Sequence, residues 1–108
     1  MDTTCDIMYD LFNSEGFLRD PRQWDSNVAA AIARQDGLPP LTAAHWAIIN
    51  ALRAHFLAFG AAPPAFSHIC LVNHMSKHCV EHLFHSQREA WRIAGLPDPG
   101  EEAKAYMQ

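Results

Sequence analysis

The sequence predicts a mainly α-helical protein: a small bundle of helices with a short β element at its N-terminal end. Two observations predict this class. Apolar residues recur with helical spacing over residues 43–59, and Thr42 and Gly60 bound that stretch as cap residues. Pro and Gly divide the rest into segments too short for parallel-sheet crossovers. A length of 108 residues suits one domain, so we expect a single domain over residues 1–108.

The first elements follow from turn and cap signals. An apolar run at residues 7–9 and an apolar pair at 17–18 flank a polar turn that contains Gly16, which predicts a β-hairpin within residues 1–19. A helix is predicted over residues 25–35, and Gly37 follows it where a C-terminal cap belongs.

The central helix, residues 43–59, has the clearest pattern. Its apolar stripe is formed by His45, Trp46, Ile49, Leu52, Phe56 and Phe59. We expect this stripe to face the middle of the core, and we expect His45 to be a packed or capping residue rather than a catalytic base.

Two further helical segments are predicted, over residues 65–78 and 80–94, with a break near residues 77–80. Gly95 is a candidate C-cap, and the prolines of 96–100 predict a rigid extended exit. Residues 101–108 have little helical pattern. The chain thus divides into a hairpin region (1–19), a helical body (20–95) and a C-terminal arm (96–108).

Charge and hydropathy exclude several classes of protein. The net charge is −4 with neutral histidines, which argues against nucleic-acid binding through a basic face. No apolar run approaches the roughly 18 to 20 residues of a spanning helix, and residues 1–6 do not resemble a signal peptide. We therefore expect a soluble, cytoplasmic protein without a membrane partner. Seven histidines make the charge sensitive to pH near 6 to 7.

A cluster of histidines is the densest group of candidate ligands. His74, His78 and His82 lie at i, i+4 and i+8, a spacing that can clamp Zn²⁺, Ni²⁺ or Cu²⁺ on one unbroken helix, with Cys70 or Cys79 assisting. The alternative is a solvated helix face. The sequence has neither HExxH nor CxxC, and we expect no cofactor.

The three cysteines, Cys5, Cys70 and Cys79, are too few and too irregular for a disulfide framework, so we expect reduced thiols. Cys79 and Cys70 are the candidate reactive thiols, and the alternative is that they are small buried apolar residues. Templates for other enzymes, such as GxSxG or a Gly-rich phosphate loop, are absent.

Several blocks occur in an order that resembles the DsrC/TusE family of sulfur-relay proteins. They are Glu15-Gly16-Phe17-Leu18, Trp24, residues 33–38, residues 41–53 around His45-Trp46, and Arg92-Ile93-Ala94-Gly95-Leu96-Pro97-Asp98-Pro99. The resemblance spans residues 13–99. It implies an orthogonal helical bundle with an N-terminal hairpin and a C-terminal arm.

The resemblance also implies a chemistry that this chain lacks. Family members that carry sulfur hold a persulfide on a near-terminal cysteine of a mobile arm, and dissimilatory members have a second cysteine just before the arginine of the last block. Here Trp91 precedes Arg92, and Glu102 lies where the arm cysteine would fall. Both thiols are missing.

These features predict a non-catalytic binding or regulatory module that docks to protein partners of a sulfur-relay or dissimilatory sulfur system. The expected partner-binding residues are Trp91, Arg92, Leu96, Pro97, Pro99 and Glu102. One alternative is a sulfurtransferase that uses Cys79 or Cys70. Another is a DNA-binding or metal- or pH-responsive regulator that uses the histidines.

Overall fold

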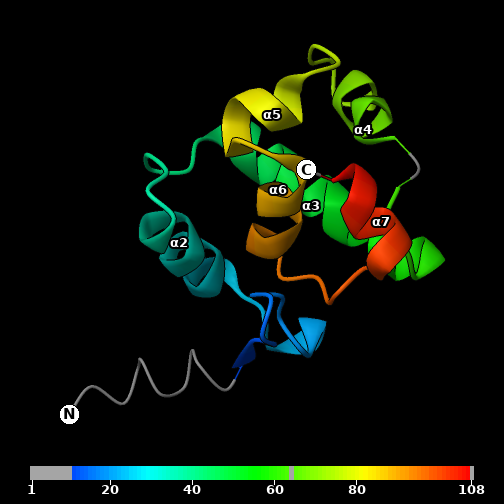
Figure 1. Ribbon diagram of the computed structural model, residues 1–108. Helices are drawn as coiled ribbons and strands as arrows, with labels where there is room; N and C mark the ends of the chain where they lie inside the picture. Colours follow the sequence, from blue (N-terminus) through cyan, green and yellow to red (C-terminus); the bar gives the residue numbers. More distant parts are fainter. Residues whose placement is uncertain (1–10, 64, 108) are drawn as a thin grey trace.

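The computed structural model describes residues 11–63 and 65–107. Within them the chain forms a 3-10 turn and six α-helices (Figure 1). The elements are η1 (Pro21–Gln23), α2 (Ser26–Gln35), α3 (Ala43–Phe59), α4 (Phe66–Val72), α5 (Cys79–Phe84), α6 (Gln87–Ile93) and α7 (Glu101–Tyr106). Helices α3 and α6 lie in the middle, with α2 on one side and α7 on the other (Figure 1). Helices α4 and α5 close one end. The predicted class, a mainly helical bundle, is confirmed.

The predicted N-terminal hairpin is wrong for the residues that the structure describes. Residues 11–20 form no strand and contain only an isolated bridge between Phe12 and Leu18. The side chain of Asn13 accepts hydrogen bonds from the backbone of Glu15 and Phe17, which holds the segment as a tight turn. Phe17 and Leu18 are both buried, whereas a half-buried strand alternates. The other half of the predicted hairpin, residues 1–10, lies outside the described residues.

Helices α2 and α3 agree with the sequence predictions. Asp25 caps α2 by accepting from the backbone of Val28. Helix α3 starts after Thr42 and ends at Gly60, which has a left-handed φ of 70°. His45 is buried: its Nδ1 accepts from the Thr42 backbone at 3.0 Å, and its Nε2 lies 2.9 Å from the carbonyl of Leu83. The predicted capping role of His45 is therefore confirmed.

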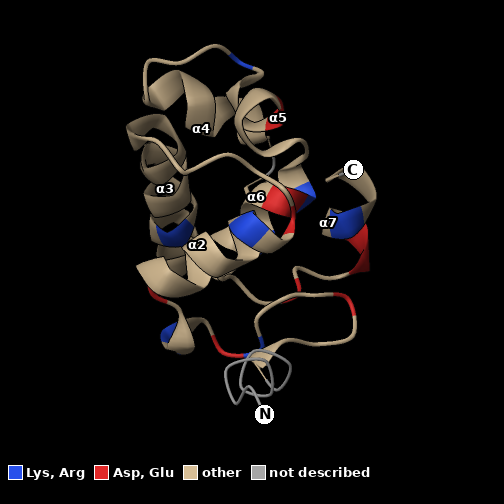
Figure 2. Ribbon diagram, turned by 90° about the vertical axis from the view of Figure 1, so that its left-hand side faces the viewer, with Lys and Arg blue, Asp and Glu red and all other residues tan. Residues whose placement is uncertain are grey.

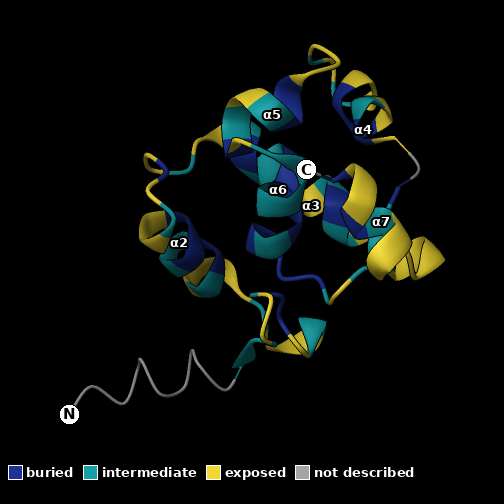
Figure 3. Cartoon of the chain, viewed as in Figure 1, coloured by how far each residue is buried: buried dark blue, intermediate teal, exposed yellow. Residues whose placement is uncertain are grey.

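One end of the predicted apolar stripe is not in the core. Phe59, in the last turn of α3, is 72% exposed. The C-terminal end of α3 extends past the neighbouring helices, as its exposed colouring shows (Figure 3). The buried residues of the predicted stripe are His45, Ile49 and Leu52, and Ile48, which the prediction left out, is buried beside them.

The second half of the body is more broken than the sequence predicted. Helix α4 ends at Val72, and the chain turns through residues 73–78 before α5 begins at Cys79. A second break separates α5 from α6, since His85 has a left-handed φ of 72° and Ser86 caps α6 by accepting from Glu89. The single helix predicted over 80–94 is thus two helices.

A last difference concerns the C-terminus. Residues 101–106 form helix α7, although the sequence showed little helical pattern there. Met107 follows α7 and belongs to the hydrophobic core. None of the described helices is long and apolar enough to cross a membrane.

Candidate functional site: the C-terminal arm

The arm, residues 96–107 of the described chain, leaves the body at a fixed point. Trp24 Nε1 donates to the carbonyl of Ile93 at 2.9 Å, which holds the indole against the end of α6. Gly95 has a φ of 69°, and a Cβ built on it would lie 1.9 Å from Trp24 Cδ1. The guanidinium of Arg53 lies 4.2 Å from the centre of the Trp24 ring and donates to the carbonyl of Ala94 at 2.8 Å. Only glycine fits at position 95.

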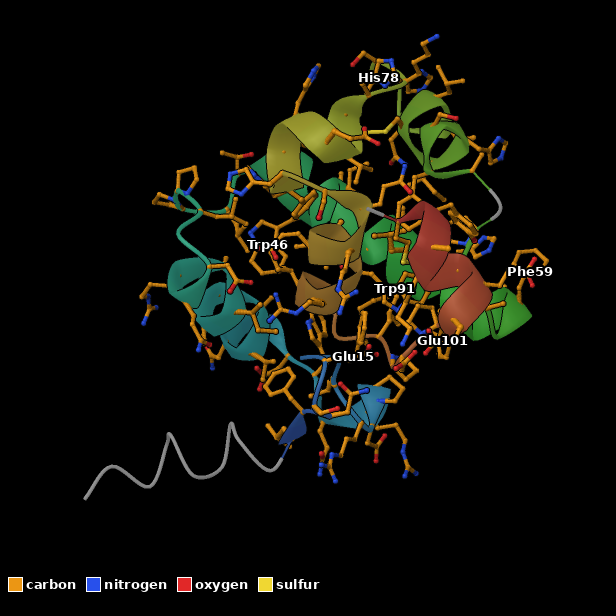
Figure 4. The ribbon with its side chains drawn as sticks, viewed as in Figure 1. Glu15, Trp46, Phe59, His78, Trp91 and Glu101 are labelled. Carbon is orange, nitrogen blue, oxygen red and sulfur yellow. A yellow bond between two sulfur atoms is a disulfide. The ribbon has the colours of Figure 1, made fainter. Side chains whose placement is uncertain are left out.

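Trp91 holds the root of the arm. Its side chain is fully buried, and its Nε1 donates to the carbonyl of Pro97 at 2.7 Å. Leu96 is also buried in the core. The indole that precedes Arg92 therefore packs in the body and fixes the start of the arm (Figure 4).

Lys104 ties α7 to the rest of the chain. It is only 6% exposed, and its Nζ donates to the carboxylates of Glu15, Asp98 and Glu101. The nitrogen–oxygen distances to Asp98 and Glu101 are 3.2 and 2.9 Å. The hydrogen bonds to Glu15 and Glu101 hold the pKa of Lys104 well above its ordinary value. The cation thus bridges α7, the exit loop and the N-terminal turn.

The end of the arm is also anchored. Met107 is fully buried, and its carbonyl accepts from the backbone N–H of Arg88, the second residue of α6, at 3.0 Å. The hydroxyl of Tyr106 donates to the carbonyl of Pro63 at 3.2 Å. The arm is therefore anchored on the body at Lys104 and at its end, while much of the surface of α7 stays exposed.

Arg92 links three parts of the fold by hydrogen bonds. Its Nε donates to the carbonyl of Gly16 at 3.1 Å, and its Nη1 donates to Asp36 at 2.7 Å and to Glu89 at 3.2 Å. These bonds join α6 to the end of α2 and to the N-terminal turn. Burial, and then the neighbouring carboxylate of Asp36, raise the pKa of Glu89 to about 7.

The predicted partner-binding residues thus differ in accessibility. Trp91 and Leu96 are buried, Arg92, Pro97 and Pro99 are half-buried, and Glu102 is exposed. Their role toward a partner stays a prediction. Sequence reasoning missed Lys104 and Met107. The i, i+4 spacing of Ala103 and Met107 was a signal for one buried side of α7, but it spans little more than one turn.

The two body cysteines correct another expectation. Cys70, in α4, and Cys79, the first residue of α5, form a disulfide with Cα atoms 5.9 Å apart. The prediction of reduced thiols is wrong for this pair. The sequence separation of nine residues alone could not show it, because the pairing depends on the turn between α4 and α5.

The structure does not assemble the predicted histidine stripe. His74 lies in the turn with a left-handed φ of 61°, His78 is the N-cap of α5, and His82 lies within α5. All three are exposed. Among residues 11–63 and 65–107, no group of three potential ligands is placed to hold a metal ion.

Comparisons with known proteins agree with this architecture. The family model described as "DsrC like protein" matches residues 9–101. The sulfurtransferase TusE of Salmonella typhimurium (strain LT2) is 32% identical over 98 residues, which cover 81% of this chain and 86% of the relative. The TusE of Escherichia coli K12 is 29% identical over 98 residues, with the same fractions of the two chains covered.

Solved structures give the same result. The oxidized γ-subunit of the dissimilatory sulfite reductase (DsrC) from Archaeoglobus fulgidus superposes with a TM-score of 0.70 at 33% identity, covering 83% of this chain and 89% of that chain. DsrC of Allochromatium vinosum has a TM-score of 0.70 at 31% identity, with 83% and 87% covered. With a family match over most of its length and relatives of this similarity, the chain belongs to the DsrC family, whose members include DsrC and TusE proteins of sulfur relay.

Proposed function

We propose that this chain acts as a non-catalytic binding or regulatory module of a sulfur-relay system. The observation that carries the proposal is the state of the arm: it contains no cysteine, and it is docked on the body by Lys104 and Met107. A module of this kind binds the proteins that cysteine-bearing relatives bind and passes on no sulfur.

Chemistry supports this reading of the arm. A persulfide needs a thiolate sulfur to hold the transferred atom, and neither the carboxylate of Glu102 nor the indole of Trp91 supplies one. Delivery by an arm also needs the arm to leave the body and enter another active site. Here Lys104 makes three ion pairs and the end of α7 is buried, so the closed position is stabilised.

The docked arm offers a distinct surface to a partner. Glu101 and Glu102 are exposed at the start of α7, where acidic residues gather (Figure 2). Tyr106 is also partly exposed, and Pro97 and Pro99 form the adjoining half-buried edge. A protein partner with basic residues would complement this surface.

A competition assay tests the proposal. A persulfide-bearing donor protein transfers sulfur to a cysteine-bearing TusE, and this chain is added in excess. We expect slower transfer to TusE and no sulfur on the arm of this chain. A variant that carries Glu102→Gln leaves the ion pair between Glu101 and Lys104 in place and should raise the transfer rate again. Unchanged transfer at saturating excess, or transfer of sulfur onward by this chain, would contradict the proposal.

A second candidate function is sulfur carriage on Cys79 or Cys70. The disulfide favours it, because it shows that the fold brings the two sulfur atoms together. Reduction of the disulfide would have to come first, since a bonded sulfur has no thiolate. Mass spectrometry of the reduced protein after incubation with a persulfide donor tests this candidate. A gain of about 32 daltons that Cys79→Ser abolishes would support it.

A further inference from the structure

We propose that the Cys70–Cys79 disulfide is a redox-sensitive clamp, which a low-molecular-weight thiol opens at Cys79 and which thereby releases residues 71–78. The inference does not rest on the proposed function of the arm. It rests on where the disulfide lies, on what else holds the enclosed segment, and on the charges around it.

The disulfide is placed between two short helices. Helix α4 has seven residues and α5 has six, and isolated helices of this length are marginal in water. The cystine joins them across the turn at the end of the molecule farthest from the N-terminal turn (Figures 1 and 4). The relative position of α4 and α5 therefore depends on this covalent link and on core packing.

Besides the disulfide, the backbone hydrogen bonds of the enclosed segment are local: the N–H groups of Asn73 and Met75 donate to the carbonyl of Cys70 at 3.1 and 2.9 Å, and that of His74 donates to the carbonyl of Leu71 at 3.0 Å. Asn73 Nδ2 donates to the carbonyl of Ile69 at 2.8 Å, and Met75 is half-buried against the core. His74 adopts a left-handed φ of 61°, a conformation that costs free energy for a residue with a side chain. Leu71 and Val72 are exposed. Once the link opens, only these local hydrogen bonds and the packing of Met75 remain to hold the segment, so we expect it to open more often.

The two cysteine residues are both buried, but they differ in their exposed area. Cys79 is 5% exposed and starts α5, whereas Cys70 has no exposed area. Lys77, His78 and His82 are exposed near Cys79, and Glu81 is the acidic residue of the same helix, hydrogen-bonded to Gln87. Of the two charged residues that flank Cys79 at a distance of two positions, the cation of Lys77 is exposed and the carboxylate of Glu81 is half-buried, which favours approach of an anionic thiolate.

The exchange proceeds in two balanced steps. The external thiolate attacks Cys79 Sγ, a mixed disulfide forms, and the bonding pair leaves with Cys70 Sγ, which takes up a proton. A second thiol molecule attacks the external sulfur of the mixed disulfide and releases Cys79 as a thiol. The protein gains two electrons and two protons, and the two thiols become one low-molecular-weight disulfide.

Amide hydrogen exchange with peptide mass spectrometry tests the clamp. Both states use the Cys5→Ser protein, so that only the two clamp cysteines can react, before and after native incubation with reduced glutathione. We expect exchange in residues 71–78 to accelerate by roughly one to two orders of magnitude, with α3 unchanged. The double variant Cys70→Ser with Cys79→Ser should show the fast pattern with or without the thiol.

Three results would overturn the proposal. One is that both thiols alkylate without any reduction after purification under oxidising conditions. Another is that the disulfide opens only as fast as α3 unfolds, or opens without faster exchange in 71–78. The third is that a trapped glutathione adduct lies on Cys70 instead of Cys79.

Discussion

Replacing Glu89 by glutamine should change how the stability of this protein depends on pH. Glu89 Oε1 is buried and has no hydrogen-bond donor among the described residues, while its Oε2 accepts from Arg92. The carboxylate of Asp36 accepts a hydrogen bond from the same nitrogen of Arg92. Burial of the carboxylate, and then the neighbouring carboxylate of Asp36, raise the pKa of Glu89 to about 7, while Arg92 opposes the rise.

The magnitude follows from linkage. Below pH 4.5, Glu89 is protonated in both the native and the unfolded chain. Between pH 4.5 and about 7 the native state keeps a proton that the unfolded state has lost, so the contribution of this group to the free energy of unfolding falls as pH rises. The full difference corresponds to roughly 3 kcal/mol. Because Arg92 and Asp36 are 22% and 23% exposed, solvent screens the cluster, and we expect about 1 to 2 kcal/mol.

Urea unfolding of the wild type and of Glu89→Gln at pH 4, 6 and 8 measures this quantity. The free energy of unfolding of the variant minus that of the wild type should rise by about 1 to 2 kcal/mol from pH 4 to pH 8, because an amide needs no proton to stay neutral. Glu102→Gln, at an exposed position, is the matched control and should show a difference that does not vary with pH. A constant difference for Glu89→Gln as well would refute the reasoning.

Three further predictions concern the arm and the body. Lys104→Gln should speed amide exchange in residues 101–107, whereas Arg22→Gln, which removes an exposed ion pair, should leave it unchanged. Equal exchange in both variants would show that Lys104 does not hold the arm. Trp91→Ala should lower the free energy of unfolding by about 3 to 5 kcal/mol in urea titrations, since it empties a fully buried site. His45→Ala should cost about 1 to 3 kcal/mol in the same assay through the lost cap and the lost bond to Leu83.

Local signals predicted the parts of the fold that local interactions determine. Helix α3 has the predicted bounds because Thr42 and Gly60 act within one turn of its ends. The capping role of His45 was predicted on the same grounds. The break at His85 was missed, because no glycine or proline marks it and a histidine takes up the left-handed φ there.

The candidate site was less predictable, because its contacts are distant in sequence. Lys104 meets Glu15 across 89 residues, and Met107 is buried against α6. The composition of α7 shows neither contact. Likewise, an odd number of cysteines did not reveal that Cys70 and Cys79 pair while Cys5 stands apart in the sequence. The missing arm thiols, in contrast, could be read directly from the sequence.

The contact between Trp24 and Gly95 means that a residue near the N-terminus helps to set the direction in which the C-terminal arm leaves α6. An indole 71 positions upstream occupies the space that a side chain at residue 95 would need, so a larger residue at 95 requires a smaller one at 24. The direction in which residues 96–99 leave the body is thus set by contacts that do not involve position 102, and it does not depend on which side chain stands there.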